Sequence, residues 1–544
     1  MLYSTMQDIP LTLTSILRHG TSIHGGRVVI TATEDGYRQI DYREFGARVA
    51  QLANALHSLG VRPSDRVATF MWNNQEHLEA YFAVPCMGAV LHTLNIRLSD
   101  EQIEFIAYDA EDTVVLVDTS LAKQLAAVLP RMETVRTVVA VGDGDTAVLE
   151  TAGKDVVRYD ELLAAQPTDF AWPDIDERAA AAMCYTSGTT GHPKGVVYGH
   201  RSTYLHSASV CSTNGMTLTE GDRALPVVPM FHANAWGIPH AALMAGADLV
   251  LPDCYAHAPR LVQMIEECRP TFAAAVPTIW NDVLHCLEND PGHDISSLRL
   301  IVCGGSAVPE SLMRTYDEKL GVTLMQLWGM TETSPVASLA RPPQGKSAEE
   351  AWQSRVTQGR PLFGVEMRIV DDDGNVLPSD GESVGELEVR GPWITGAYYR
   401  DRDAEKFADG WLRTGDVGRI DSLGYVTLTD RSKDVIKSGG EWISSVELEN
   451  HLMGHPDVLE AAVVGVPDER WQERPLAAVV LKENAAVTAP QLRDYLRDRV
   501  VRWWLPERWV FVDEVPRTSV GKFDKKVIRS RYADDVYDVV ECTD

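Results

Sequence analysis

Apolar side chains recur at every third or fourth position between residues 42 and 59, and Gly60 follows them. This spacing places the apolar side chains on one face of an amphipathic helix, and a glycine is typical of a helix end. The apolar positions are Phe45, Val49, Leu52, Leu56 and Leu59. The pattern therefore predicts a helix over residues 42–59 with one buried face.

Short apolar runs alternate with helical patterns after this helix. The second helical pattern begins with Ser99, a residue type that caps helix N-termini. Helices are predicted at 75–87 and 99–110, and strands at 66–71, 89–92, 113–117, 179–185, 248–251, 271–276 and 298–302. Strands that alternate with helices indicate parallel sheets, so the expected fold class is α/β.

The pattern changes near Val365 to short strands separated by turn residues, which predicts a β-rich subdomain over about residues 360–430. The polar stretch D-R-S-K-D at 430–434 suits a linker. A second set of predicted helices and strands lies at 445–453, 460–466, 476–481, 489–500 and 509–512. We therefore expect a large N-terminal domain over residues 1–432 and a small C-terminal domain over residues 433–544. The acidic tail at 534–544 is expected to fray.

The net charge of the chain restricts the classes of ligand that it can bind. Lys and Arg number 50 against 78 Asp and Glu, a net charge of −28, and this argues against sequence-independent nucleic-acid binding. No apolar run reaches the roughly 18 residues of a membrane span, although peripheral contact with a membrane is compatible with the sequence. Residues 1–18 lack a basic region before an apolar run, so no secretory signal is predicted.

The eight cysteines are scattered, without a C-x-x-C pair or a Cys/His cluster. Free thiols in a reducing cytoplasm are therefore expected, in preference to zinc ligands or a disulfide framework. The cysteines are Cys86, Cys184, Cys211, Cys254, Cys268, Cys286, Cys303 and Cys542.

The stretch Y-T-S-G-T-T-G-H-P-K-G at 185–195 combines glycines, hydroxyl side chains and a lysine. Such a loop can wrap backbone N–H groups and a cation around a phosphate chain, although a flexible surface turn would have a similar composition. It is not a Walker A loop, because the sixth position from Gly188 is Pro193 and Lys194 is followed by glycine. The pattern favours phosphate binding after a buried strand.

Two further motifs offer groups that suit a nucleotide. Q-L-W-G-M-T-E-T-S-P at 326–335 has an aromatic face, a hydroxyl and a carboxylate of the kind that Mg²⁺ prefers. W-L-R-T-G-D-V-G at 411–418 places Asp416 after a Thr-Gly turn, where it can accept the hydroxyls of a ribose. Taken singly, Trp328 could be a core residue and Asp416 a turn cap.

The last two motifs lie toward the C-terminus. D-R-S-K-D-V-I-K-S-G-G-E-W-I at 430–443 places three basic residues where the two predicted domains meet, and either a hinge with anion contacts or a plain charged linker fits it. P-R-T-S-V-G-K at 516–522 ends in Lys522, which in isolation would be a surface residue.

Together and in this order, the five motifs resemble those of the adenylate-forming superfamily, which includes acyl-CoA synthetases, firefly luciferase and peptide-synthetase adenylation domains. The resemblance covers nearly the whole chain. Within the superfamily, the segments 228–239, 436–449 and 502–506 are most similar to bacterial medium- and long-chain fatty-acid:CoA ligases. Ligases of methylthio-propanoate are similar as well.

The resemblance implies a luciferase-like adenylating fold with a mobile C-terminal domain, and a reaction in two steps. A carboxylate attacks the α-phosphorus of Mg²⁺·ATP to give acyl-AMP and pyrophosphate, and the thiol of CoA then displaces AMP. It implies catalytic roles for Lys522, Lys194, Thr331 and Glu332. It also implies a Mg²⁺ site at Glu332 and Ser187.

The resemblance further implies ATP/AMP contacts at Thr186, Ser187, Gly188, Thr189, Thr190, Gly191, Gly305, Gln326, Leu327, Trp328, Thr331, Asp416, Arg431, Lys433, Lys437 and Trp442. The family often has Tyr where this chain has Trp328, and an indole lacks the hydroxyl that could reach the acyl phosphate. Lys433 occupies the family's hinge position.

Acyl-substrate contacts are implied at His232, Trp236, Gly304 and Gly305. A ring at Trp236 would suit a gate to an apolar tunnel, while a core aromatic is the plainer alternative.

The resemblance leaves two kinds of alternative for the function. Short-chain, methylthio-alkanoate or aryl acids would be substrates of the same class of enzyme. A non-catalytic acyl- or nucleotide-binding relative would have lost Lys194, Glu332, Asp416 or Lys522, and this chain retains all four. By analogy with relatives, a homodimer is expected.

Overall fold

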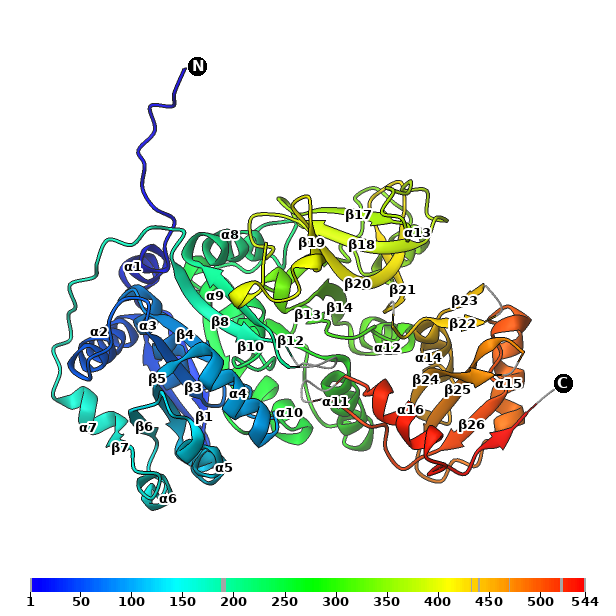
Figure 1. Ribbon diagram of the computed structural model, residues 1–544, viewed down its shortest axis with the longest axis horizontal. Coiled ribbons are helices and arrows are strands. Elements are labelled where there is room, and N and C mark those ends of the chain that lie inside the picture. The colour runs from blue at the N-terminus through cyan, green and yellow to red at the C-terminus, as the bar shows by residue number, and fades with distance from the viewer. Residues whose placement is uncertain are drawn as a thin grey trace.

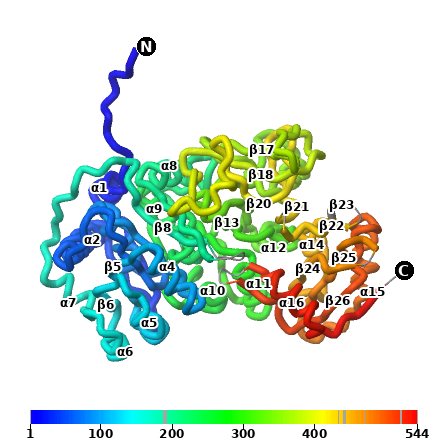
Figure 2. The backbone as a smooth tube through the Cα atoms, in the orientation of Figure 1, coloured from blue at the N-terminus to red at the C-terminus, as the bar shows by residue number. Residues whose placement is uncertain are grey.

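The computed structural model describes residues 2–186, 192–431, 433–438, 441–468, 470–518 and 522–542, with the backbone alone at 441–442. Figure 1 shows two large sheets with their helices, a smaller sheet above them and a separate C-terminal unit at one end. Figure 2 follows the chain between them from the N-terminus to the C-terminus. No helix among the described residues is long and apolar enough to cross a membrane.

The first sheet has seven strands in the order β7-β6-β5-β3-β4-β8-β9, and its neighbours are parallel except for the antiparallel pair β8 and β9. Its strands are β3 (Arg66–Phe70), β4 (Val90–Thr93), β5 (Asp112–Asp118), β6 (Thr137–Val141), β7 (Asp155–Arg158), β8 (Ala180–Tyr185) and β9 (Gly195–Gly199). The predicted phosphate loop therefore connects β8 to β9.

The second sheet has nine strands in the order β16-β15-β14-β13-β12-β10-β11-β1-β2, with a parallel centre and antiparallel edges. Its strands are β1 (Val28–Ala32), β2 (Tyr37–Asp41), β10 (Arg223–Pro226), β11 (Asp248–Leu251), β12 (Phe272–Ala275), β13 (Leu300–Cys303), β14 (Thr323–Gly329), β15 (Val336–Leu339) and β16 (Arg360–Pro361).

Helices pack against both sheets and share one core between them. The helices of this shared layer are α1 (Leu13–Ile23), α2 (Tyr42–Ser58), α3 (Gln75–Cys86), α8 (His200–Cys211) and α9 (Ile238–Ala245). The predicted face of α2 is buried at Phe45, Val49, Leu52 and Leu56. Outer helices are α4 (Asp100–Ala110), α5 (Ala122–Val128), α6 (Ala147–Glu150), α7 (Tyr159–Ala164), α10 (Ala258–Cys268), α11 (Pro277–Asn289), α12 (Glu310–Leu320) and α13 (Ala348–Arg355).

The predicted start of α4 is confirmed. The Ser99 side chain accepts a hydrogen bond from the backbone N–H of Gln102, and the Gln102 side chain accepts one from the backbone N–H of Ser99. This reciprocal arrangement satisfies two N–H groups that a helix start leaves without partners.

A five-stranded antiparallel sheet follows, as the predicted β-rich region requires. Its strands are β17 (Glu366–Val370), β18 (Gly385–Arg390), β19 (Phe407–Ala408), β20 (Trp411–Ile420) and β21 (Val426–Arg431). Because β21 is its last strand, the linker leaves this sheet directly beside Asp416 on β20.

The C-terminal unit is a six-stranded sheet with helices α14 (Ser445–Met453), α15 (Ala489–Arg497) and α16 (Lys525–Ala533). Its strands are β22 (Ile436–Ser438), β23 (Glu441–Ile443), β24 (Val458–Asp468), β25 (Gln472–Leu481), β26 (Arg508–Phe511) and β27 (Val540–Glu541). The expectation that the acidic tail frays is wrong for this strand. β27 pairs with β26 and Cys542 is buried, so backbone pairing holds the tail despite its charge.

Candidate active site

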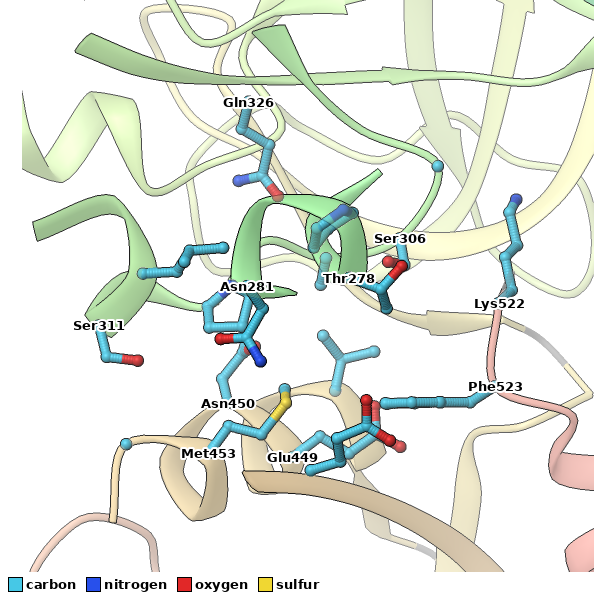
Figure 3. Close-up of a pocket in the computed structure, with 18 of the residues that line it drawn as sticks. Thr278, Asn281, Ser306, Ser311, Gln326, Glu449, Asn450, Met453, Lys522 and Phe523 are labelled. Atoms are coloured by element: carbon cyan, nitrogen blue, oxygen red, sulfur yellow. The ribbon is translucent and has the colours of Figure 1, made fainter. Parts of the chain in front are cut away.

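A cavity of about 510 Å³ lies between the second sheet and the C-terminal unit. Figure 3 shows side chains around it from α11, from the loop before α12, from α14 and from the segment that carries Lys522. Eight of the predicted site residues line this cavity: Gly305, Gln326, Leu327, Trp328, Asp416, Arg431, Lys433 and Lys522. Four motifs that are distant in the sequence therefore meet at one place.

Asp416 is held in a defined orientation at this cavity. The indole N–H of Trp328 donates a hydrogen bond of 2.8 Å to one carboxylate oxygen of Asp416, and Arg431 pairs with the other oxygen at 2.9 Å. The charge of Asp416 is the main reason why the pKa of Arg431 is raised. Trp328 thus supports a buried carboxylate, a role that the sequence did not predict.

The loop after β13 needs its two glycines. A Cβ on Gly304 would lie 2.5 Å from Cδ1 of Leu327, and Gly305 has φ +89°. Gln326 holds the same loop, because its side-chain oxygen accepts a 2.9 Å hydrogen bond from the backbone N–H of Val308. Its amide group donates to the carbonyl of Thr357 at 2.8 Å, so this side chain is engaged by protein groups.

Lys522 lies within electrostatic reach of the groups at this end of the cavity. Burial, together with the positive charge of Arg431, lowers the pKa of Lys522 to about 8, although Asp416 and Glu332 act in the opposite direction. Its backbone N–H donates to the Thr518 hydroxyl at 3.2 Å. The ammonium group therefore lies within electrostatic range of both predicted carboxylates.

The ends of the predicted phosphate loop are joined. The backbone N–H of Thr186 donates to the carbonyl of Lys194 at 2.9 Å, and the N–H of Lys194 donates to the Thr186 hydroxyl at 3.1 Å. The predicted contacts at Ser187, Gly188, Thr189, Thr190 and Gly191 lie outside the described residues.

Lys194 and Glu332 meet at a residue that the sequence analysis missed. Tyr398 donates a hydrogen bond from its hydroxyl to Glu332, and the ammonium of Lys194 lies 5.3 Å from the centre of the Tyr398 ring. Lys194 also forms an ion pair with Asp403. Thr331 is buried nearby, with its carbonyl accepting a 2.8 Å bond from the Tyr198 hydroxyl. No local sequence signal marks Tyr398 or Asp403, because their partners are distant in the chain.

The donor set at Glu332 fits Mg²⁺ if substrate oxygens complete it. Mg²⁺ commonly takes one or two carboxylates together with phosphate oxygens and water. Within the described ranges, no group of three or more His, Cys, Asp or Glu side chains could hold a metal ion by itself. The second predicted metal ligand, Ser187, falls outside those ranges.

His232 precedes a strained turn, and Trp236 is the last residue of that turn. Burial, followed by the charges of Lys522 and Arg97, lowers the pKa of His232 to about 4, so its ring is neutral at pH 7. Trp236 is buried, and the four residues 233–236 have φ between 42° and 57°. Such left-handed backbone is costly for residues other than glycine and tends to occur at functional sites. Neither residue lines the described cavity.

Lys437 and Trp442 are placed elsewhere. They face each other in the register of β22 and β23, and Lys437 is exposed. Lys437 does not belong to the lining of the described cavity, and neither do Thr186, Lys194, Gly304, Thr331 and Glu332.

Comparison with known proteins identifies the family. The AMP-binding enzyme family matches residues 18–399, and the AMP-binding enzyme C-terminal domain matches residues 447–522. The chain is 42% identical over 536 residues to 3-methylmercaptopropionyl-CoA ligase of Ruegeria lacuscaerulensis, covering 97% of this chain and 98% of that protein. It is 44% identical over 537 residues to the long-chain-fatty-acid–CoA ligase of Thermus thermophilus, covering 97% of each chain. It is 41% identical over 529 residues to the medium-chain-fatty-acid–CoA ligase of Ectopseudomonas oleovorans, covering 96% of each.

Solved structures agree with these relatives. The anthranilate CoA ligase AuaEII in complex with anthranoyl-AMP has a TM-score of 0.87 at 27% identity, covering 98% of this chain and all of that one (100%). ATP-bound MatB from Rhodopseudomonas palustris has a TM-score of 0.82 at 26% identity, covering 97% and 100% of the two chains. The predicted adenylating fold is therefore confirmed. With the fatty-acid:CoA ligase relatives, these matches establish that the chain belongs to the AMP-binding enzyme family of AMP-forming acid:CoA ligases.

Proposed function

We propose that this protein is an AMP-forming fatty-acid:CoA ligase. It converts a fatty acid and ATP to acyl-AMP and pyrophosphate, and then converts acyl-AMP and CoA to acyl-CoA and AMP. The observation that carries the proposal is the meeting of Trp328, Asp416, Arg431 and Lys522 at one cavity. This set of groups suits the binding of a nucleotide and the reaction of a carboxylate with it.

Asp416 accepts the ribose hydroxyls in this proposal. Trp328 and Arg431 hold its carboxylate in advance, so little freedom is lost when the nucleotide arrives. The backbone of Gly305 and Leu327 and the ring of Trp328 form the walls against which the base lies. Gln326 acts by fixing the loop rather than by contacting the base, because its amide group is already bonded to protein atoms.

The first chemical step brings two anions together, and cations must offset their repulsion. The carboxylate oxygen of the acid attacks the α-phosphorus, and the bond from that phosphorus to pyrophosphate breaks. Lys522 is the cation for this step, and Lys194 holds the pyrophosphate end together with Thr331 and the loop at 186–191. Mg²⁺ would be held by Glu332 and phosphate oxygens, with Ser187 as a further ligand, and would neutralise charge on the departing pyrophosphate.

The second step requires access for CoA. We propose that the C-terminal domain, residues 433–544, turns relative to residues 1–432 about Lys433. This movement would withdraw Lys522 and bring Lys437 and Trp442 toward the nucleotide or CoA. The CoA thiol, after losing its proton, attacks the acyl carbon, and the bond to AMP breaks.

The acyl chain lies on the side of His232, Trp236, Gly304 and Gly305. A neutral, partly buried imidazole and a buried indole suit an apolar chain and exclude water from the acyl phosphate. A 3-(methylthio)propanoate-type acid is the second candidate substrate, because the chain is 42% identical to a 3-methylmercaptopropionyl-CoA ligase over 97% of its length.

A homodimer in the cytoplasm is also part of the proposal. Leu2, Tyr3, Met6 and Ile9 are strongly exposed on an N-terminal arm that projects from the body of the molecule (Figure 1). An apolar arm of this kind is suited to a second copy of the chain. Light scattering of the full chain and of a form without residues 1–10 tests this arrangement, and a monomeric full chain would refute it.

A panel of straight-chain acids from C4 to C18, with aryl and methylthio acids, tests the function. AMP release that requires both CoA and a fatty acid is expected. Release with a methylthio or aryl acid alone would move the substrate to that class, and the absence of acid-dependent ATP–pyrophosphate exchange with the whole panel would refute the ligase.

A further inference from the structure

A buried charged cluster adjoins the cavity where β21, α14 and α16 meet. The ammonium of Lys525 lies 2.8 Å from a carboxylate oxygen of Glu449, and the two side chains are only 12% and 9% exposed. The same oxygen of Glu449 accepts a 2.8 Å hydrogen bond from the backbone N–H of Val463. Glu449 and Lys525 both line the cavity, and Figure 3 shows Glu449 on α14 near the segment that carries Lys522.

Ser445 extends the cluster across the linker. Lys525 donates to the hydroxyl of Ser445, and this hydroxyl in turn donates to the carboxylate of Asp430. The backbone N–H of Ser445 donates to the same carboxylate at 3.0 Å, and Ser444 donates to the carbonyl of Thr429 at 2.6 Å. Thr429 precedes the linker at 430–434 and Asp430 is its first residue, whereas Ser445 and Lys525 follow it. A rotation within residues 431–436 would therefore separate these partners.

The charges explain why a lysine is needed here. Asp430 and Glu449 are both buried, and a buried carboxylate is costly unless a cation or donors offset its charge. Burial raises the pKa of Glu449 to about 7, and Lys525 acts against this rise. Lys525 is also the first residue of α16, three positions after Lys522. Because only two residues separate them, a displacement of Lys525 should also displace Lys522.

We propose that Lys525 is a positioning residue for acyl-adenylate formation. Through Glu449, Ser445 and Asp430 it fastens the start of α16 to β21, and so holds the ammonium of Lys522 beside Asp416. This inference rests on the proposed ligase function, in which Lys522 serves the first half-reaction.

Measuring the two half-reactions separately distinguishes a positioning role of Lys525 from a purely stabilising one. Adenylation uses Lys522 in this orientation, whereas conversion of supplied acyl-AMP and CoA does not. Loss of the anchor should therefore slow the first reaction and spare the second. A residue that only stabilises the fold would lower both reactions together.

The test compares Lys525→Met with Lys526→Met, because Lys526 is the adjacent lysine and is exposed. ATP–pyrophosphate exchange, thioester formation from supplied acyl-AMP, and the thermal unfolding midpoint are measured for each full-length variant. Lys525→Met is expected to lower exchange by about 10- to 100-fold, the range for a catalytic group misplaced by about 1 Å. Thioester formation should change less than about 3-fold, well below a tenfold step of 1.4 kcal/mol. Lys526→Met should match the wild type in all three measurements.

Ser445→Ala keeps every charge and removes only the hydroxyl that links Lys525 to Asp430, so it serves if Lys525→Met folds poorly. It should lower exchange while thioester formation is retained, and Lys525→Arg should restore part of the exchange that Lys525→Met loses. Equal loss in both half-reactions, or unchanged exchange in Ser445→Ala and Lys525→Met, would overturn the inference. A wild-type protein without exchange would instead refute the ligase function itself.

Discussion

The charge of Lys522 should limit adenylation at alkaline pH. Burial and the neighbouring Arg431 lower the pKa of Lys522 to about 8 in the free protein. The group is cationic below this pKa and neutral above it. The cationic fraction is therefore about 0.9 at pH 7 and about 0.1 at pH 9, since each pH unit from the pKa is a factor of ten. If only the ammonium form supports the first step, the rate should fall about tenfold between these values.

The measurement is kcat/KM for ATP in acid-dependent ATP–pyrophosphate exchange between pH 6.5 and 9.5, because kcat/KM reports pKa values of the free enzyme. An alkaline limb with a midpoint near pH 8 is expected. Thioester formation from supplied acyl-AMP, which does not use this ammonium, should lack this limb.

Lys522→Arg provides the control, because a guanidinium stays charged throughout the range. This variant should have a lower rate, since its shape differs, but its profile should lose the limb. A wild-type profile that is flat to pH 9.5, or a limb that persists in Lys522→Arg, would refute the assignment of this pKa to Lys522.

Three further predictions concern contacts that the structure describes. Trp328→Phe removes the hydrogen bond to Asp416, so the carboxylate must become ordered when ATP binds. Kd for ATP, measured by calorimetry, should therefore rise by about 3- to 10-fold, which corresponds to the free-energy cost of immobilising one side chain on binding. Asp403→Asn removes the carboxylate that competes with ATP for Lys194, so Kd for ATP should fall. Because this ion pair is partly exposed, the fall should be only about 2- to 5-fold. Asp109→Asn weakens a buried carboxylate that binds two arginines and a tyrosine hydroxyl, and should lower the free energy of unfolding in urea by about 1.5–3 kcal/mol.

Two of these predictions have a matched control variant, and the third has a refuting outcome. Asp401→Asn makes the same charge change two residues from Asp403 at an exposed position, and should leave Kd for ATP unchanged. Equal effects of the two variants would mean that net charge, and not the contact with Lys194, controls binding. For Trp328→Phe, an unchanged Kd would show that Asp416 needs no support from the indole. For Asp109, the exposed Asp100→Asn is the reference, and an equal loss of stability in both would contradict the prediction.

Much of the local structure could be predicted from the sequence. The apolar face of α2, the cap at Ser99 and the buried strand before the phosphate loop depend on residues within about two helical turns or one strand. Periodicity, capping and turn chemistry act over this distance, and each therefore leaves a pattern in consecutive residues. The order of the motifs along the chain also allowed the family and the site residues to be predicted.

The contacts between these motifs were decided by the tertiary structure. Trp328 and Asp416 are 88 residues apart, and Tyr398 and Glu332 are 66 apart. Their meeting depends on which strands become neighbours and on where the five-stranded sheet lies against the large domain, and no pattern in consecutive residues records this. The acidic tail illustrates the same limit, because its composition favours disorder while pairing with β26 holds it.

The sequence by itself thus determined the elements, the chemical groups and the family of this protein. The tertiary structure decided which groups meet: the indole with the ribose-site carboxylate, the phosphate-loop lysine with Asp403, and the lysine at the start of α16 with Glu449 and, through Ser445, with Asp430. The physical reason is that local preferences are set by neighbouring residues, whereas the environment of a charge is set by all the chain segments that pack around it.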